Sequence, residues 1–265
     1  MSVVEGIDRL EAGLGPLFIV VGVFDGLHRG HAYLLEHLVA EAARRSARPA
    51  VLTFDHHPDE ILVGAAPPLL CDPQERLERL AAAGVDVTIV QTFDVALRMT
   101  AYDAFVHRIA DRAALSGFLM TPDAAFGHDR GGTPDTVGAL GSELGYDVVV
   151  VPPFELDGRP VRSSDIRAAI AAGDLTTAAR LLGREVSLTG RLEADGDDRR
   201  LVFDLPVAMP PPGAYVVRIQ PLGAPAAPPA SGPGTLVVDD ARSVHLAATG
   251  IASGVRVRVT LAKGT

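Results

Sequence analysis

The chain has 265 residues, of which 48% are hydrophobic and 22% are charged, the composition of a globular protein. Its length fits one large domain, or one medium and one small domain. The 33 acidic residues outnumber the 24 lysines and arginines, and the formal net charge of −9 argues against nucleic acid or an anionic membrane as the main partner.

The first two-thirds of the chain alternates strand-like and helix-like segments. Short, near-continuously apolar runs rich in β-branched and aromatic residues predict strands buried on both faces at 17–24, 49–54, 85–93, 117–120 and 146–153. Apolar stripes between them predict helices at 31–45, 74–84 and 100–114, the last capped by Thr100. This alternation predicts an α/β fold with a parallel, Rossmann-like sheet.

From about residue 184 the pattern changes to short alternating segments separated by turn residues. These segments lie at 187–194, 199–206, 213–221, 234–240, 243–248 and 255–262. Such a series predicts a small antiparallel β-barrel. The Pro- and Ala-rich stretch at 221–234 has little that could pack and is expected to be mobile. We therefore predict two domains, residues 1–184 and residues 185–265.

The segment GVFDGLHRGH begins at Gly22, follows the first predicted strand and leads into the first helix. Ligands of open α/β sheets bind beyond the carboxyl ends of the strands, and helix N-termini attract anions. Gly22, Gly26 and Gly30 would let the backbone approach a phosphate closely. His28 and His31 could then donate ring N–H groups to phosphate oxygens as negative charge grows in a transition state.

Two other interpretations of this segment compete with nucleotide chemistry. A zinc site would use the histidine pair, but no cysteine or glutamate follows at ligand spacing, so we predict no metal ligands among the side chains. A purely structural turn would explain the glycines and not the histidines. The segment matches neither a Walker A loop nor a G-x-G-x-x-G turn, which disfavours ordinary kinases and dehydrogenases.

Three further stretches accompany this segment: TFDHHP at 53–58, DAAFGHDRGGT at 123–133 and RSSDIRAAIAAGDLTTAARLLGR at 162–184. Together, the four resemble the bacterial bifunctional riboflavin kinase/FAD synthetase family, whose N-terminal domain is an H-x-G-H nucleotidyltransferase. The family's counterparts read G-x-F-D-G-x-H-x-G-H, T-F-x-P-H-P, D-F-x-F-G-x-x-x-x-G, and S-[ST]-x-[IV]-R followed by G-D-x-x-x-A-x-x-L-L-G-R. They occur in the same order and span the whole first domain.

The resemblance implies transfer of AMP from Mg-ATP to the phosphate of FMN, giving FAD and pyrophosphate, with Mg²⁺ as the cofactor. His28 and His31 would stabilise charge at the α-phosphate, and Arg167 would hold the departing phosphates. The residues implied to contact the nucleotide are Gly22, Phe24, Asp25, Gly26, Gly30, Asp123, Ser163 and Ser164. Those implied to border the flavin are Phe54, His57 and Phe126. Without ligand roles, either serine would be a helix N-cap and Arg167 a partner in a surface ion pair.

The chain departs from the family pattern where the flavin would bind. His56 stands at the place of a proline, and Ala124 and Ala125 stand where the family carries Phe and often Arg or Thr. Flavins stack on aromatic rings, and this chain lacks one such ring at this place. A second function therefore stays open: nucleotidyltransfer to another phosphate monoester or from another triphosphate. A third possible function is that of a non-catalytic regulator that binds flavin or nucleotide.

The predicted barrel resembles the family's riboflavin kinase domain without its motif. Where the family has G-F-P-T-A-N, whose threonine and asparagine bind Mg-ATP, this chain reads VFDLP at 202–206. His245 takes the place of the glutamate that serves as the base. We therefore predict no riboflavin kinase activity.

Cys71, the single cysteine, excludes an intrachain disulfide. The N-terminus has no basic segment followed by an apolar stretch, and no apolar run approaches the roughly 20 residues that span a bilayer. We expect a cytoplasmic protein whose partners are the small molecules ATP and FMN, with neither nucleic acid nor a membrane among them.

Overall fold

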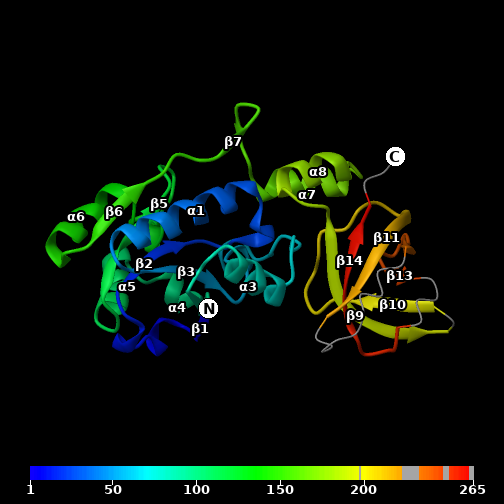
Figure 1. The fold of residues 1–265 in the computed structure, drawn as a ribbon, viewed down its shortest axis with the longest axis horizontal. Helices are drawn as coiled ribbons and strands as arrows, with labels where there is room; N and C mark the ends of the chain where they lie inside the picture. Colours follow the sequence, from blue (N-terminus) through cyan, green and yellow to red (C-terminus); the bar gives the residue numbers. More distant parts are fainter. Residues whose placement is uncertain (197, 223–232, 247–250, 263–265) are drawn as a thin grey trace. The chain divides into compact units, whose positions relative to one another are not determined.

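The computed structural model describes residues 1–196, 198–222, 233–246 and 251–262 (Figure 1). Contacts along the backbone divide the chain into two compact units. Unit 1 comprises Met1–Phe24, Gly30–Pro67 and Leu77–Pro160. Unit 2 comprises Asp25–Arg29, Pro68–Arg76 and Val161–Thr265. A domain boundary at residue 184 stays a prediction, and the contact-based division groups the helices just before it with the barrel.

Unit 1 contains a six-stranded parallel sheet, which confirms the predicted α/β fold. Its order is β1-β4-β3-β2-β5-β6, and every neighbouring pair is parallel. The strands are β1 (Ser2–Glu5), β2 (Leu17–Val21), β3 (Arg48–Phe54), β4 (Val87–Gln91), β5 (Leu115–Met120) and β6 (Asp147–Val150). Strand β2 has β3 on one side and β5 on the other, so the strand order reverses there, where such sheets bind ligands.

Helices connect these strands and cover both faces of the sheet. They are α1 (Arg29–Arg44), α2 (Asp59–Leu62), α3 (Pro73–Ala82), α4 (Val95–Arg98), α5 (Tyr102–Ala110) and α6 (Pro134–Leu144). Figure 1 draws α1 on one side of β2 and α5 on the other. On the α5 side, Ile19 packs in one buried cluster with Val106 and Ile109. On the α1 side, the guanidinium of Arg45 lies 4.7 Å from the ring centroid of Phe18.

Short elements complete unit 1 and its connection to unit 2. The 3₁₀ helices of unit 1 are η1 (Ile7–Arg9), η2 (Ala12–Leu14) and η4 (His128–Arg130), and η3 (Asp25–Leu27) belongs to unit 2. A two-stranded hairpin joins β7 (Glu155–Leu156) to β8 (Arg159–Pro160). The part of the chain that the structure describes contains no helix of the length and apolarity needed to cross a membrane.

The helix predicted at 100–114 is shorter at both ends, and its predicted N-cap is wrong. Ala101 is the N-cap of α5 and makes no side-chain capping bond. Thr100 Oγ1 instead donates to the carbonyl oxygen of Ala96 at 2.8 Å, because Thr100 directly follows Met99, the C-cap of the preceding helix α4. The hydroxyl therefore closes α4 and is not turned toward α5.

Unit 2 contains a closed six-stranded barrel, which confirms the prediction for the C-terminal part. Its order is β10-β13-β12-β11-β14-β9, and all its pairs are antiparallel. The strands are β9 (Ser187–Asp195), β10 (Asp198–Val202), β11 (Gly213–Pro221), β12 (Pro233–Val238), β13 (Val244–Leu246) and β14 (Arg256–Leu261). Helices α7 (Ser163–Ala171) and α8 (Leu175–Leu182) precede it and contact each other.

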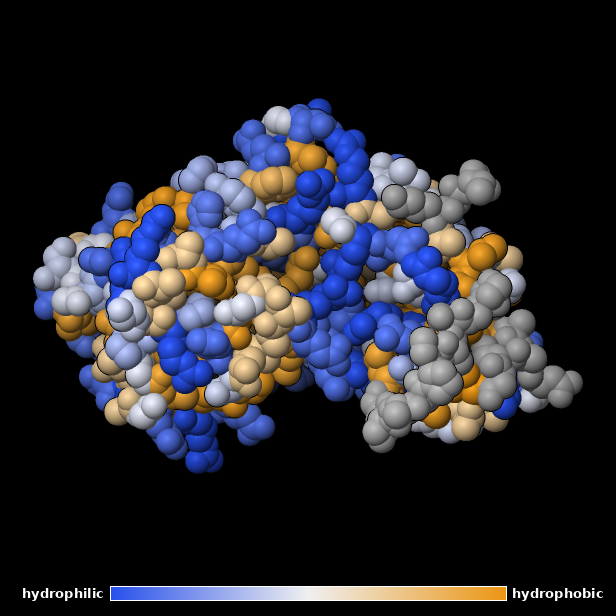
Figure 2. Space-filling model, in the orientation of Figure 1, coloured by the Kyte–Doolittle hydropathy of each residue, from blue (hydrophilic) through white to orange (hydrophobic). Residues whose placement is uncertain are grey.

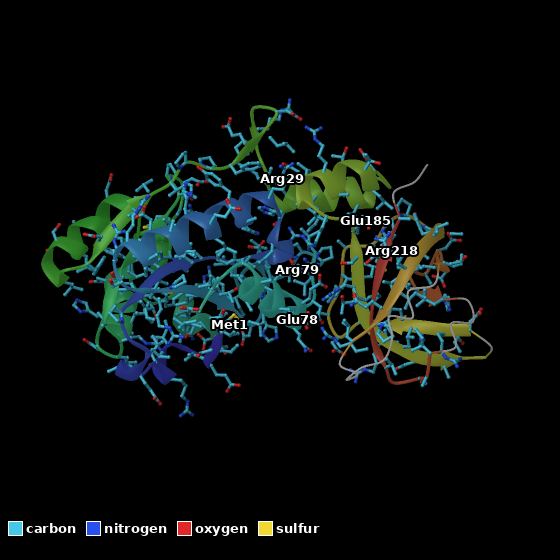
Figure 3. The ribbon with its side chains drawn as sticks, in the orientation of Figure 1. Met1, Arg29, Glu78, Arg79, Glu185 and Arg218 are labelled. Atoms are coloured by element: carbon cyan, nitrogen blue, oxygen red, sulfur yellow. The ribbon has the colours of Figure 1, made fainter. Side chains whose placement is uncertain are left out.

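The barrel interior is apolar because alternate residues of its strands point inward. In β14 the buried positions are Val257, Val259 and Leu261, each separated by a half-buried residue. Figure 3 shows Glu185, just before β9, beside Arg218 of β11, and the two side chains form an ion pair. The stretch predicted to be mobile, 221–234, falls largely outside the described residues, as does the end of the segment at 243–248.

The surface carries both hydrophobic and hydrophilic residues. Figure 2 shows hydrophobic residues interspersed with hydrophilic ones on the face drawn there. In unit 1, large apolar side chains are exposed near the ends of two short helices: Leu62 and Val63 at α2, and Val95 and Met99 at α4. Single exposed apolar residues are ordinary, but Leu62 and Met99 also line the cavity at the carboxyl edge of the sheet.

Candidate active site

A cavity of about 760 Å³ lies in unit 1 where the parallel strands end. Its wall includes Gly22 directly after β2, Phe54 at the end of β3, Phe93 after β4 and Thr121 after β5. Open α/β sheets bind ligands at this edge, and the volume is that of a small-molecule site.

Aromatic rings form much of the cavity wall. Phe54 and Phe93 meet edge to face, with ring centroids 5.3 Å apart. Phe126 lies 5.3 Å from Phe105 and 5.9 Å from Phe118, measured between centroids. The structure thus brings two of the three predicted flavin residues, Phe54 and Phe126, to one cavity.

Asp123 also lines this cavity. Its carboxylate accepts a hydrogen bond from Thr121 Oγ1 at 2.8 Å, and its carbonyl accepts one from Arg130 Nη2 at 3.1 Å. Ala124 and Ala125, the departures from the family pattern, line the same cavity. Their small side chains leave room where a larger residue would stand.

The third predicted flavin residue, His57, is not among the residues that line the cavity. Its ring is half-buried, and Nδ1 accepts a hydrogen bond from the backbone N–H of Asp59 at 3.2 Å. This bond orients His57 at the start of α2. A contact between His57 and a flavin stays a prediction.

The loop that closes one side of the cavity has an unusual backbone. Gly127, Asp129 and Arg130 have φ angles of 77°, 52° and 57°. A Cβ added to Gly127 would lie 2.7 Å from the backbone of Tyr102, so this loop packs tightly against the start of α5. Left-handed non-glycine residues are costly, and they persist where the surrounding structure fixes them, often at functional sites.

The H-x-G-H segment has a similar backbone. Phe24, Gly26 and Leu27 have φ angles of 53°, 78° and 36°. A Cβ at Gly26 would lie 2.8 Å from Cβ of Leu70, so the protein's own turn and packing already require this glycine. That Gly22, Gly26 and Gly30 also admit a phosphate stays a prediction.

The two histidines of the segment have different surroundings. His28 is 5% exposed, and burial, followed by the charges of Arg184 and Arg167, lowers the pKa of His28 to about 4. The imidazole of His28 is therefore neutral at neutral pH, with one nitrogen as donor and the other as acceptor. His31 is half-buried in unit 1, and its ring centroid lies 5.0 Å from that of Phe24.

Asp25, Ser163 and Arg167 meet within unit 2. Arg167 Nη2 donates to Asp25 Oδ2 at 2.6 Å, and Ser163 Oγ donates to the carbonyl oxygen of Asp25 at 3.2 Å. Arg162 is the N-cap of α7, so Ser163 is not the helix cap, and Ser164 lies exposed in the first turn. Arg167 does form an ion pair, but its partner is buried and not a surface residue.

The predicted site residues divide between the two units. Unit 1 holds Gly22, Phe24, Gly30, His31, Phe54, His57, Asp123 and Phe126. Unit 2 holds Asp25, Gly26, His28, Ser163, Ser164 and Arg167. Among the residues that the structure describes, no group of three or more His, Cys, Asp or Glu side chains is arranged to hold a metal ion.

Sequence reasoning assigned no role to several residues that the structure places at these sites. Arg184 ends the 162–184 stretch, and its charge acts on His28. Phe93 and Met99 line the cavity from the end of β4 and from α4. A sequence signal for Phe93 exists, because it follows a buried strand as Phe54 ends one.

The barrel has a smaller cavity of about 410 Å³, lined in part by Phe203, Asp204 and Leu205 of the VFDLP stretch. Arg191 Nη2 lies 3.3 Å from Asp204 Oδ1 at its wall. His245 lies elsewhere, with Nδ1 3.1 Å from a carboxylate oxygen of Asp195 and Nε2 3.4 Å from one of Asp239.

Comparisons with known proteins agree with the resemblance seen in the sequence. The sequence model of the FAD synthetase family matches residues 12–165. A bifunctional riboflavin kinase/FMN adenylyltransferase of Pseudomonas fluorescens is 31% identical over 72% of this chain and 62% of its own length. The protein of the same name from Escherichia coli (strain K12) is 30% identical over 84% of this chain and 74% of its own. A crystal structure of a macrolide-efflux protein from Streptococcus pneumoniae shares the fold, with a TM-score of 0.82, 21% identity, and coverage of 99% of this chain and 89% of that one.

Proposed function

Because the chain belongs to the FAD synthetase family, we propose that it transfers AMP from Mg-ATP to the phosphate of FMN. A phosphate oxygen of FMN forms a bond to the α-phosphorus, and the bond from that phosphorus to the oxygen bridging to the β-phosphate breaks. FAD forms and pyrophosphate leaves, without a covalent enzyme intermediate. The observation that carries the proposal is the H-x-G-H segment directly after the central strand β2, within the stretch that matches the family.

His28 acts as a neutral hydrogen-bond donor in this proposal. Burial and the charges of Arg184 and Arg167 lower its pKa to about 4, so a bond from its ring N–H to a phosphate would add no charge. A donor fixed in a buried site stabilises the charge that develops on phosphate oxygens in the transition state. His31 supplies a second donor from the start of α1.

The negative charge of the triphosphate is balanced by Mg²⁺ and by arginine side chains. Mg²⁺ enters with ATP as part of the substrate and neutralises phosphate charge. Arg167 and Arg184 both lie near enough to His28 to act on its pKa, so they also favour an anion there. Ser163 and Arg167 hold the departing pyrophosphate, as the resemblance implies.

The acceptor occupies the cavity at the carboxyl edge of the sheet. Phe54 and Phe126 line this cavity, and a volume of about 760 Å³ accommodates a planar ring system. Ala124 and Ala125 widen the same cavity, which favours a second candidate function, adenylylation of a different phosphate monoester.

A panel of acceptors and triphosphates tests the proposal. The protein is incubated with Mg²⁺ and each combination of ATP or CTP with FMN, riboflavin or a pantetheine phosphate, and pyrophosphate release is followed. ATP with FMN is expected to give pyrophosphate and FAD in equal amounts. Pyrophosphate from another combination alone would establish the second candidate, and release from none would refute both.

The barrel carries no riboflavin kinase activity in this proposal. The positions that correspond to the family's Thr and Asn fall in the VFDLP stretch, where Asp204 forms an ion pair with Arg191. His245 lies between two carboxylates, Asp195 and Asp239. Riboflavin with Mg-ATP is expected to give no FMN and no ADP above a protein-free control, and FMN formed at the rate of FAD synthesis would refute this.

A further inference from the structure

Asp25 is a buried carboxylate that accepts several hydrogen bonds from described residues of the protein. It is 3% exposed, and the backbone N–H of Leu70 lies 2.9 Å from Oδ1 and 3.0 Å from Oδ2. The N–H of Cys71 donates to Oδ1 at 3.3 Å, and Arg167 Nη2 donates to Oδ2 at 2.6 Å. A buried charge is tolerated only when paired and hydrogen-bonded, and Asp25 is both.

The same residues are tied together by bonds that do not involve this carboxylate. Arg167 Nε donates to the carbonyl of Pro68 at 2.8 Å, and Ser163 Oγ donates to the carbonyl of Asp25 at 3.2 Å. The N–H of Gly26 donates to Cys71 Sγ at 3.3 Å. Three stretches of unit 2, at 25–29, at 68–76 and at the start of α7, are therefore fixed to one another.

This network orients the guanidinium of Arg167. Its Nε and Nη2 are held by Pro68 and Asp25, while Nη1 has no bond to any described residue. An arginine held at two of its nitrogens loses little further freedom when the third binds a phosphate. The side chain as a whole is 16% exposed, so the guanidinium is not fully enclosed by the protein.

We propose that Asp25 is a positioning residue that holds Arg167 and the loop bearing His28 in place for the nucleotide, and does not itself touch it. This inference rests on the proposed function. It assigns Asp25 a different role from the direct nucleotide contact that the motif implies, because both oxygens of the carboxylate already accept bonds from the protein.

A double-mutant cycle in kcat tests this role. Asp25→Asn keeps an oxygen for the N–H groups of Leu70 and Cys71 and removes the charge that pairs with Arg167. Arg167→Met keeps the aliphatic stem and removes the guanidinium. Asp25→Asn is expected to lower kcat roughly tenfold in the native background, and less than about twofold in the Arg167→Met background. KM for FMN is expected to stay within about twofold.

Asp165→Asn is the matched control, an exposed aspartate on α7, and should change nothing. Equal losses of kcat from Asp25→Asn in both backgrounds would mean that Asp25 acts independently of Arg167, and would overturn the inference. An unchanged kcat with a lower melting temperature would show a merely structural anchor, and would overturn it as well.

The native protein separates this inference from the proposed function. No FAD from native protein refutes the proposed function, whereas FAD from native protein with an additive cycle refutes only the positioning role. The same four proteins are titrated with Mg-ATP by calorimetry. The effects of the Asp25 and Arg167 substitutions on the Kd for Mg-ATP are also expected to be coupled. Additive effects on this Kd would contradict the inference whatever the acceptor proves to be.

Discussion

Arg167 and Asp25 lie 142 positions apart in the chain and meet with Nη2 2.6 Å from Oδ2. The resemblance implies that Arg167 binds phosphate, and the structure adds that its guanidinium is already shared with a protein carboxylate. The ion pair joins the loop after β2 to helix α7 within unit 2. Residues that we propose to serve the chemistry therefore also bind three segments of this unit to one another.

Asp25→Ala is expected to lower the free energy of unfolding by about 3–5 kcal/mol, because it removes the acceptor of the half-buried Arg167 Nη2 and of the backbone N–H groups of Leu70 and Cys71. Asp25→Asn, which keeps an oxygen, should cost about 1–2 kcal/mol. Urea unfolding at pH 7 measures both, with the exposed Asp165→Ala as the reference. A loss below about 1 kcal/mol for Asp25→Ala would contradict the buried pair.

Acid should destabilise the protein through His28. The pKa of His28 is about 4 in the folded protein against 6.5 for an unperturbed histidine, chiefly because burial disfavours the charged ring. Between these values the unfolded chain binds more protons than the folded one. The free energy of unfolding should therefore fall as the pH drops from 6.5 to 4, by about 3 kcal/mol from this residue.

His28→Gln removes this contribution to the pH dependence. Urea unfolding at pH 7, 5.5 and 4.5 should show a flatter profile for His28→Gln than for the native protein. His107→Gln, the same substitution at an exposed position of α5, is the matched control. Parallel profiles for the native protein and His28→Gln would mean that His28 titrates as an exposed histidine does.

Gly26→Ala is expected to cost about 2–4 kcal/mol, since it combines a left-handed backbone with a Cβ only 2.8 Å from that of Leu70. Gly158→Ala is the matched control. Gly158 has a φ of +72°, and a Cβ there would meet nothing within 4 Å, so only the backbone strain of about 1 kcal/mol applies. Equal losses at the two positions, measured by thermal unfolding, would rule out the contact with Leu70 as a cause.

Ala125→Trp tests the acceptor cavity. A large ring at this lining position should fill part of the cavity and raise KM for FMN at least about tenfold, while KM for ATP stays within about twofold. Steady-state FAD formation gives both constants. Ala40→Trp, at an exposed position of α1, should change neither. An unaltered KM for FMN would place the acceptor elsewhere.

The sequence predicts the larger elements of this fold because their patterns are strong. Continuous apolar runs predict β2 to β6, and alternation predicts the barrel strands. It misses β1, four residues with a single half-buried side chain, since the strand is held by its backbone pairing with β4. It also misses α6, although Thr133 and Thr136 form a capping box around its first turn and Pro134 is its first residue.

The sequence also predicts part of the candidate site, again because of its strand pattern. Residues next to strand ends, such as Phe54 and Asp123, are brought to the cavity by topology, which the pattern of strands contains. The bonds of Asp25 to Leu70 and Cys71 depend on a loop with no regular pattern, and the bond to Arg167 joins distant parts of the chain. Such contacts come from tertiary packing, which no local pattern encodes.

The central claim is that this chain moves an adenylyl group, and the most direct measurement follows that group. Native protein is incubated with FMN and Mg-ATP that carries radioactive phosphorus at the α position, and the products are separated by chromatography. The label should appear in FAD, and His28→Ala should slow its appearance at least about a hundredfold. Label that stays in ATP with folded native protein, or that is released only as AMP, would contradict the account.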